Sequence, residues 1–272
     1  MNVNGDHVRH GDDYSSDYYP DLILNDTLQY MRYSHRFFSS RPYLIVMSFP
    51  SPHGTEDAAP QFQKKFFGEQ THRTPSWNVA PNLDKQWILR QTGSMTPLQQ
   101  HFTNFLHTKR LQTLQSVDDA VKKVYDELRA LNELDNTYIV YTSDNGYHLG
   151  QFGLIKGKAM PFEFDIRVPF FVRGPDIPAG AVLKDIVLNI DIAPTFMDIA
   201  GIKAPSHMDG NSFLPALRSL ANEDNSATLI RTDKNSKNSR IRNSFLIEKG
   251  FVSIFYICLC FSMKYSFFFC LF

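Results

Sequence analysis

The residues with the clearest chemical potential are a carboxylate and an amide at the end of an apolar run. The run, Tyr138 to Thr142, is rich in β-branched and aromatic residues, as expected of a buried strand. Asp144 and Asn145 follow it, and α/β proteins bind ligands at strand ends. Their hard oxygen atoms suit Ca²⁺ or Mg²⁺. The Asp-Asn-Gly sequence also suits a plain turn, because Asn and Gly tolerate positive φ.

Three basic side chains follow this pair closely in the sequence: His148, Lys156 and Lys158. Imidazole and ammonium groups beside a metal would neutralise the charge of an anionic substrate. The grouping therefore favours a site for an anionic ester, with the turn as the simpler alternative.

Several regular elements must position these groups. Tyr43 to Phe49 predicts a second buried strand, and His53 follows it in a Pro/Gly turn. A loop histidine needs no function, so the residues alone leave both interpretations open. Apolar residues at three-four spacing predict a long helix over Thr96 to Leu131 and a shorter one over Asp21 to Phe38. The basic pairs of the long helix are interpreted as its solvated face.

The second half of the chain continues the alternation of strands and helices. Val168 to Val172 predicts a strand, 185–190 is a further apolar run, and helices are expected over 191–201 and 212–220. This order predicts an α/β fold with a mainly parallel or mixed sheet, right-handed crossovers and flanking helices. The polar segment 222–243 is expected to be a loop or linker.

Composition limits the classes of partner and compartment. Acidic and basic residues balance at 28 each, so no nucleic-acid partner is expected. Residues 1–6 lack the features of a signal peptide, which suggests an incomplete chain if the protein is secreted. Asn25 begins an acceptor sequence for N-glycosylation. The three cysteines, Cys258, Cys260 and Cys270, do not reveal the compartment.

The last residues, 251–272, are almost wholly apolar. A membrane span is one interpretation, but Lys264 interrupts the run and no basic cluster flanks it, so membrane association stays open. We expect a hydrophobic tail that is not homologous to the rest of the chain.

The run Ser143 to Gln151 resembles the second metal motif of sulfatases, in the alkaline-phosphatase superfamily. The resemblance extends over roughly His10 to Gly250 and is strongest to the extracellular heparan sulfate glucosamine-6-sulfatases (endosulfatases), followed by lysosomal N-acetylglucosamine-6-sulfatase. It implies that residues 1–250 are part of a sulfatase catalytic domain with an alkaline-phosphatase-like fold, incomplete at the N-terminus.

The resemblance also implies roles for single residues. Asp144 and Asn145 correspond to late ligands of a Ca²⁺ ion, and His53 and Lys158 to catalytic residues that contact the sulfate. His148 is expected to contact the leaving group or the sugar. Family members use a formylglycine made from a Cys-x-Pro-x-Arg cysteine, and no cysteine here has that context. The chain is therefore expected to be inactive alone.

The function implied is hydrolysis of glucosamine 6-sulfate groups in heparan sulfate-type glycosaminoglycans. The expected partners are heparan sulfate proteoglycans or other sulfated glycosaminoglycans, in the Golgi, at the cell surface or outside the cell. The alternatives are a phosphatase or phosphodiesterase of the same superfamily and a non-catalytic glycosaminoglycan-binding fragment.

Overall fold

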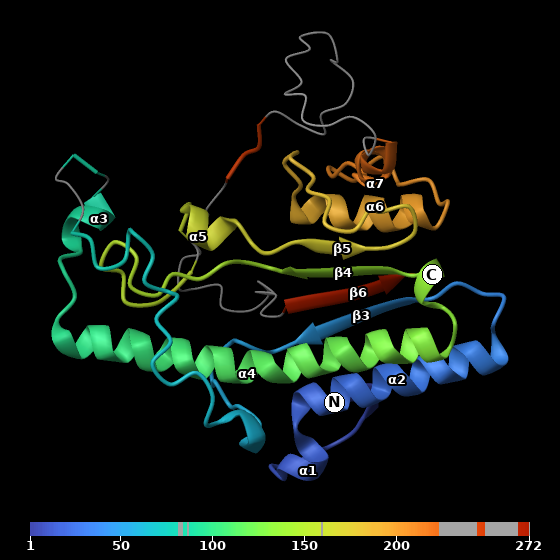
Figure 1. The fold of residues 1–272 in the computed structure, drawn as a ribbon, viewed down its shortest axis with the longest axis horizontal. Coiled ribbons are helices and arrows are strands. Elements are labelled where there is room, and N and C mark those ends of the chain that lie inside the picture. The colour runs from blue at the N-terminus through green and yellow to red at the C-terminus, as the bar shows by residue number, and fades with distance from the viewer. Residues whose placement is uncertain (81–83, 86, 159, 223–243, 248–265, 272) are drawn as a thin grey trace, which may run out of the picture.

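The structure is a computed structural model that describes residues 1–80, 84–85, 87–158, 160–222, 244–247 and 266–271 (Figure 1). Its helices and strands are β1 (Asn2–Val3), β2 (Asp6–His7), α1 (Tyr14–Asp17), α2 (Tyr19–Phe37), β3 (Leu44–Phe49), α3 (Trp87–Gln91), α4 (Pro97–Ala130), β4 (Tyr138–Ser143), α5 (Glu163–Ile166), β5 (Phe171–Arg173), α6 (Ile192–Ile199), α7 (Leu214–Ser219) and β6 (Ser266–Leu271). Strands β1 and β2 form a separate antiparallel pair.

The main sheet brings two strand ends to the same edge. Its strand order is β3-β6-β4-β5, and each hydrogen-bonded pair is antiparallel. Because β3 and β4 both run against β6, they point the same way (Figure 1). Phe49 and Ser143, the last residues of β3 and β4, both lie opposite Ser266. The segments that follow these two strands therefore leave the sheet at one edge.

This antiparallel pairing differs from the parallel arrangement of neighbouring strands that the alternation of strands and helices predicts. Strand β6, from the C-terminal end of the chain, lies between β3 and β4, and β5 returns beside β4 in the opposite direction. The α/β class and the flanking helices are as predicted. The homology of the tail stays a prediction, and its residues 251–265 lie outside the described part of the chain.

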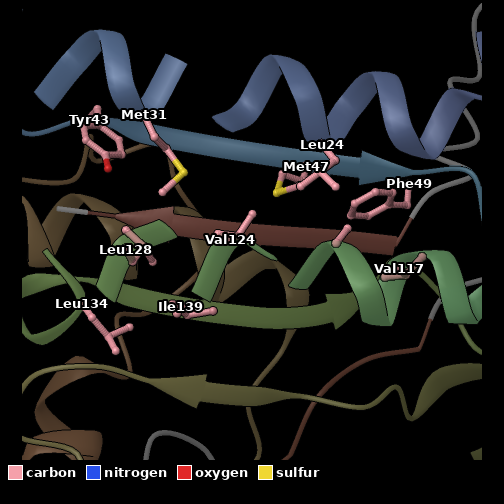
Figure 2. Packing of buried hydrophobic residues seen from close by; sticks show 11 residues of the cluster. Leu24, Met31, Tyr43, Met47, Phe49, Val117, Val124, Leu128, Leu134 and Ile139 are labelled. Atoms are coloured by element: carbon pink, nitrogen blue, oxygen red, sulfur yellow. The ribbon is translucent and has the colours of Figure 1, made fainter. Parts of the chain in front are cut away.

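Helices cover both faces of the sheet. On one face, side chains from α2, β3 and α4 pack with Ile139 into a continuous core (Figure 2). On the other face, Tyr138 and Val140 pack against α6 and α7. This division follows from the pleat of β4, since successive side chains point to opposite faces. Strand β4 is therefore buried on both sides, and the residues that follow it are held on a rigid base.

The long helix α4 confirms the predicted element and has a well-defined start. The Thr96 side chain accepts a hydrogen bond from the Gln99 backbone, and the Gln99 side chain accepts one from the Thr96 backbone. This capping box satisfies two backbone donors that the helix leaves free. Farther along, Glu127 receives two bonds from Arg32 of α2, at 2.8 and 2.7 Å. The predicted shorter helix is α2, which packs against α4.

Other elements begin or end at residues different from those that the sequence patterns predict. The predicted strand over Val168 to Val172 is reduced to β5, because Pro169 has no backbone donor for a sheet. The apolar run 185–190 leads into a 3₁₀ turn at Asn189–Asp191, where the Asp191 carboxylate accepts bonds from the backbone of Leu188 and Asn211. Residues 223–243, most of the predicted linker, lie outside the described residues. None of the described helices combines the length and the apolar composition that a membrane span requires.

Candidate active site

A cavity of about 570 Å³ opens at the edge where β3 and β4 end. Its lining joins the loop after β3, the segment after β4 and one side of α4. It includes Ser51, Pro52, His53, Gly54, Thr55, Glu56, Arg110, Leu114, Tyr141, Ser143, Asp144, Asn145, Gly146, Tyr147, Lys156, Lys158 and Pro169. The cavity thus gathers four of the predicted site residues, although 91 positions separate His53 from Asp144 (144 − 53 = 91).

Asp144 carries an oxygen atom that lacks a partner among the described residues. Its Oδ1 accepts a bond from the backbone N–H of Asn145 at 2.9 Å, while Oδ2 is buried and unbonded. Burial raises the pKa of the Asp144 carboxyl above its ordinary value, although Lys158 opposes the shift. A buried carboxylate oxygen without a donor is costly unless a cation approaches it. This oxygen therefore fits a divalent metal.

The neighbouring amide is oriented by two contacts. The Asn145 side chain donates from Nδ2 to the Gly146 carbonyl at 2.8 Å, which fixes Oδ1 as the outward atom. That oxygen accepts a bond from Lys158 Nζ at 3.1 Å. Asp144 and Asn145 would thus offer a charged and a neutral oxygen to a Ca²⁺ ion. The described residues contain no group of three or more His, Cys, Asp or Glu suited to a metal, so this pair would be a partial ligand set.

Gly146 allows the chain to turn closely past α5. Its backbone N–H donates to the Asp165 carbonyl at 2.8 Å, and Tyr147 donates to the Phe164 carbonyl at 2.9 Å. A Cβ atom at position 146 would lie 2.1 Å from the Phe164 oxygen. The glycine is thus required by a close backbone approach, beyond its general suitability for turns.

His148 does not line the cavity, and its expected contact with a leaving group or sugar stays a prediction. The side chain is buried, and its Nδ1 lies 3.1 and 3.0 Å from the two carboxylate oxygens of Asp165. The same carboxylate accepts a bond from the Met160 backbone. His148 also exchanges two backbone bonds with Gly157, at 2.9 and 3.1 Å. His148 therefore connects the segment after β4 to the loop that carries Lys158.

His53 is half-buried and lines the cavity from the loop after β3. Its Nδ1 lies 2.8 Å from the carbonyl oxygen of Gly54. Because a carbonyl can only accept, Nδ1 bears the proton and Nε2 is left for another partner. The structure therefore brings His53 and Lys158 to the same cavity.

Arg110 is a cavity residue that the sequence patterns assigned to a solvated helix face. It donates from Nη1 to the Pro52 carbonyl at 2.8 Å, and its guanidinium carbon lies 3.9 Å from the centre of the Tyr147 ring. The interpretation as solvated was wrong for this residue. Arg110 precedes Leu114 by four positions, so it continues the apolar stripe of α4. The four-residue spacing from Leu114 could have indicated from the sequence that Arg110 lies on the packed side of α4.

Other predicted residues lie at the margin of the site. Lys156 lines the cavity but is exposed. Glu163 and Arg167 form an ion pair at 3.0 Å, with side chains 70% and 80% exposed, so the pair contributes little to stability. Asn25 is exposed on α2, while the Thr27 hydroxyl of its acceptor sequence is buried and bonded to Ile23. Glycosylation at Asn25 stays a prediction.

The architecture and the strand-edge site define an α/β protein of the alkaline-phosphatase-like type. A solved structure described as a complex with its substrate D-glucosamine-2-N,6-O-disulfate aligns with a TM-score of 0.59 and 23% identity, over 79% of this chain and 54% of that one. A solved structure from Bacteroides fragilis gives a TM-score of 0.61 at 16% identity, over 75% and 42%. At these identities the likeness supports the fold.

The sequence comparisons identify the family. The family model described as Sulfatase matches residues 4–202, and the chain belongs to the sulfatase family. The extracellular sulfatase SULF-1 homolog of Drosophila melanogaster is 61% identical over 227 residues, which cover 83% of this chain and 20% of that protein. Human N-acetylglucosamine-6-sulfatase is 42% identical over 226 residues, which cover 82% and 40%. The chain thus spans two fifths or less of the length of these relatives.

Proposed function

We propose that this chain supplies one half of the site of a sulfuric ester hydrolase that acts on glucosamine 6-sulfate groups of heparan sulfate-type glycosaminoglycans. The observation that carries the proposal is that Asp144, Asn145, Lys158 and His53 line the same cavity. The substrate class is supported by the names of the relatives, among them N-acetylglucosamine-6-sulfatase. In this proposal heparan sulfate proteoglycans or other sulfated glycosaminoglycans are the partners, in the secretory pathway or outside the cell.

The chemistry of a sulfate ester explains why these residue types belong together. Its oxygen atoms carry negative charge, which must be neutralised when the ester is bound and cleaved. Lys158 supplies an ammonium group, and its bond to Asn145 keeps it beside the oxygen pair. His53 presents Nε2 from the loop after β3. A Ca²⁺ ion held by Asp144 and Asn145 would add Lewis-acid charge when bound.

The cysteines of the chain indicate a limit on its activity. Sulfate transfer needs a nucleophile, and none of the three cysteines lies in a Cys-x-Pro-x-Arg sequence. We therefore expect these 272 residues to bind a sulfated sugar without cleaving it. Hydrolysis of a fluorogenic sulfate ester by the purified chain would contradict this expectation.

The alternatives predict different binding. A phosphatase or phosphodiesterase with two metal ions needs a larger set of Asp and His ligands, and the described residues hold no such cluster. A non-catalytic glycosaminoglycan-binding fragment would bind long polyanions through a clustered basic face. Its binding would be insensitive to the loss of Lys158 and would decline steeply with salt.

The test is a calorimetric titration of the chain, with Ca²⁺ present, against N-acetylglucosamine 6-sulfate and unsulfated N-acetylglucosamine. We expect measurable affinity for the sulfated sugar only. The Lys158→Gln variant should lose about tenfold in affinity, because a charge-assisted hydrogen bond is removed. Lys123→Gln, which removes an exposed charge from α4, is the matched control. Equal binding of both sugars, or equal effects of both variants, would contradict the proposal.

A further inference from the structure

The loop over residues 71–78, which we call the strap, is fastened to the segment 149–152 that follows β4. The Gln151 side chain donates a hydrogen bond to the His72 carbonyl at 2.8 Å. Two backbone bonds of 2.8 Å also join the strap to this segment, from Asn78 to Gly150 and from Phe152 to Ser76. Because 149–152 precedes Lys158 in the same loop, the strap braces one side of the candidate site.

The His72 side chain of the strap is buried, and neither of its ring nitrogens has a hydrogen-bond partner among the described residues. The residue is 8% exposed. Its ring centre lies 4.4 Å from that of His107 on α4 and 6.0 Å from that of Trp77, with the ring planes at 36° and 87°. The neutral ring suits these aromatic contacts. A second proton would bury a charge that nothing in this packing pairs.

The surroundings of His72 disfavour a proton on its ring. Burial lowers the pKa of His72 to about 4, with the positive charges of His107 and Arg73 acting in the same direction. Asn104 of α4 is a polar neighbour that opposes the shift only in part. The segment 149–152 contributes no titratable side chain. The closed strap is therefore compatible with neutral His72 and resists the imidazolium form.

His107 brings a second titratable ring to the same contact. Its Nε2 lies 2.9 Å from the Thr71 hydroxyl, at the start of the strap. Burial and the charge of Arg110 lower the pKa of His107, and Glu69 opposes them. Protons on both rings would place two cations within one stacked pair. The contact between His72 and His107 thus weakens in acid from both sides.

We propose that His72 is an acid-sensitive latch: when its ring takes up a proton, the strap 71–78 separates from 149–152 and the imidazolium reaches water. Acid favours the released form, because that form binds the proton that the closed form resists. The ordinary pKa of 6.5 and the closed-form pKa of about 4 allow up to about thirtyfold more release at about pH 5 than at about pH 7.5. The latch is independent of the proposed function, since it operates without substrate or metal.

The first experiment follows the fluorescence of Trp77, whose ring meets His72 edge-on. The chain has two tryptophans, and Trp87 is 64% exposed, so Trp87→Phe leaves Trp77 as the only indole. We expect its emission to move to longer wavelength between about pH 7.5 and about pH 5, because release exposes the indole to water. His72→Phe in this background keeps a packed ring that takes up no proton and should abolish the change. His101→Gln, which removes an exposed histidine of α4, should retain it.

Hydrogen exchange then locates the opening. The amides of Asn78 and Phe152 close the strap, and their exchange, corrected for the intrinsic rate, should be about tenfold to thirtyfold faster at about pH 5 than at about pH 7.5. Amides of α4 between Thr113 and Val124 should keep their protection. Thermal unfolding at about pH 7.5 identifies a variant that fails to fold. If His72→Phe fails, His72→Gln, which also has no titratable ring, takes its place.

Each outcome decides for or against the latch. Faster exchange that is confined to the strap and its partner segment, and that is absent from His72→Phe, supports it. Equal protection of Asn78 and Phe152 at both pH values in the unmodified chain overturns it without any variant. A response that survives in His72→Phe assigns the acid sensitivity to another group and overturns it as well. An equal loss of protection in α4 would show general acid unfolding in place of a local release.

Discussion

The segment after β4 is closed by bonds between its own distant ends, whereas the loop after β3 combines short local turns with contacts from other parts of the chain. Within 144–165, backbone bonds join Gly146 to Asp165 and His148 to Gly157, and the buried His148–Asp165 pair closes the same segment. In the loop 50–57, Arg110 of α4 bonds to the Pro52 carbonyl and Tyr18 bonds to the Asp57 carbonyl. The wall after β4 is thus held largely by bonds within one segment, and the wall after β3 is held also by α4 and Tyr18.

This difference explains which roles each wall can perform. A metal and a sulfate need ligands held in narrow geometry, and Asp144, Asn145 and Lys158 all belong to the wall after β4. His53 and Arg110 belong to the wall that depends on tertiary contacts. Substitutions in the first wall should therefore affect stability and metal binding together, and those in the second should affect mainly the loop 50–57.

The largest effect is expected from Asp165→Ala. The change removes the acceptor shared by the buried His148 ring and the Met160 backbone, so we expect a loss of about 3 kcal/mol in the free energy of unfolding. Urea denaturation followed by far-UV circular dichroism measures it. Glu163→Ala on the same helix removes an exposed ion pair and should cost less than about 0.5 kcal/mol. Equal losses in the two variants would show that the wall after β4 has no special rigidity.

A smaller loss is expected from Gly146→Ala. The added Cβ would lie 2.1 Å from the Phe164 oxygen, so the turn must move away from α5. We expect a destabilisation of about 2 kcal/mol and a weaker response of the melting temperature to Ca²⁺. Gly93→Ala, where a Cβ would meet no atom within 4 Å, is the matched control, because neither Gly93 nor Gly146 has a positive φ. A Gly146→Ala chain that keeps its Ca²⁺ response would separate the turn from the metal site.

Calcium binding should depend on pH through Asp144. Burial raises the pKa of this carboxyl, so protons compete with Ca²⁺ at pH values above those for an ordinary Asp, whose pKa is 3.8. Ca²⁺ affinity should therefore fall as the pH decreases toward that range. Thermal unfolding with and without Ca²⁺, from about pH 4 to about pH 7, measures the change.

The raised pKa of Asp144 also predicts how the stability of the metal-free chain depends on pH. A carboxyl whose pKa is raised in the folded state contributes stability at pH values below its unfolded-state pKa. That contribution is lost as the pH rises through the folded-state pKa. Asp144→Asn should therefore stabilise the metal-free chain at neutral pH and abolish the Ca²⁺ response. A Ca²⁺ response that survives in this variant would place the metal elsewhere.

The smallest effect on stability is expected from Arg110→Gln. The Pro52 carbonyl would lose one hydrogen bond, which predicts a cost of about 1 kcal/mol. The loop 50–57 should then be cleaved faster in limited proteolysis, while 144–165 keeps its protection. Lys109→Gln is the control for the loss of charge on α4. Faster cleavage in both walls would show that they are not independent.

Local sequence patterns predicted the elements whose own residues show a clear periodicity or composition. The three-four spacing of apolar residues located α4, and the β-branched run located β4. The Asp-Asn pair and Lys158 were predicted from the motif, and they meet through a contact over thirteen positions. The sequence did not reveal that Asp165 would hold His148 in a buried pair outside the cavity lining. Arg110 was missed, because its separation from His53 hides their proximity.

The sequence by itself determined the family, the helix and strand that build the base of the site, and the local oxygen and ammonium groups at the end of β4. These depend on interactions between near neighbours, which leave periodic or motif signals. Only the tertiary structure decided that β3 and β4 end opposite the same residue, Ser266, and that His53, Arg110 and Asp144 line one cavity. Strand order and burial arise from packing between distant segments, and no local pattern specifies which distant side chain will share a cavity.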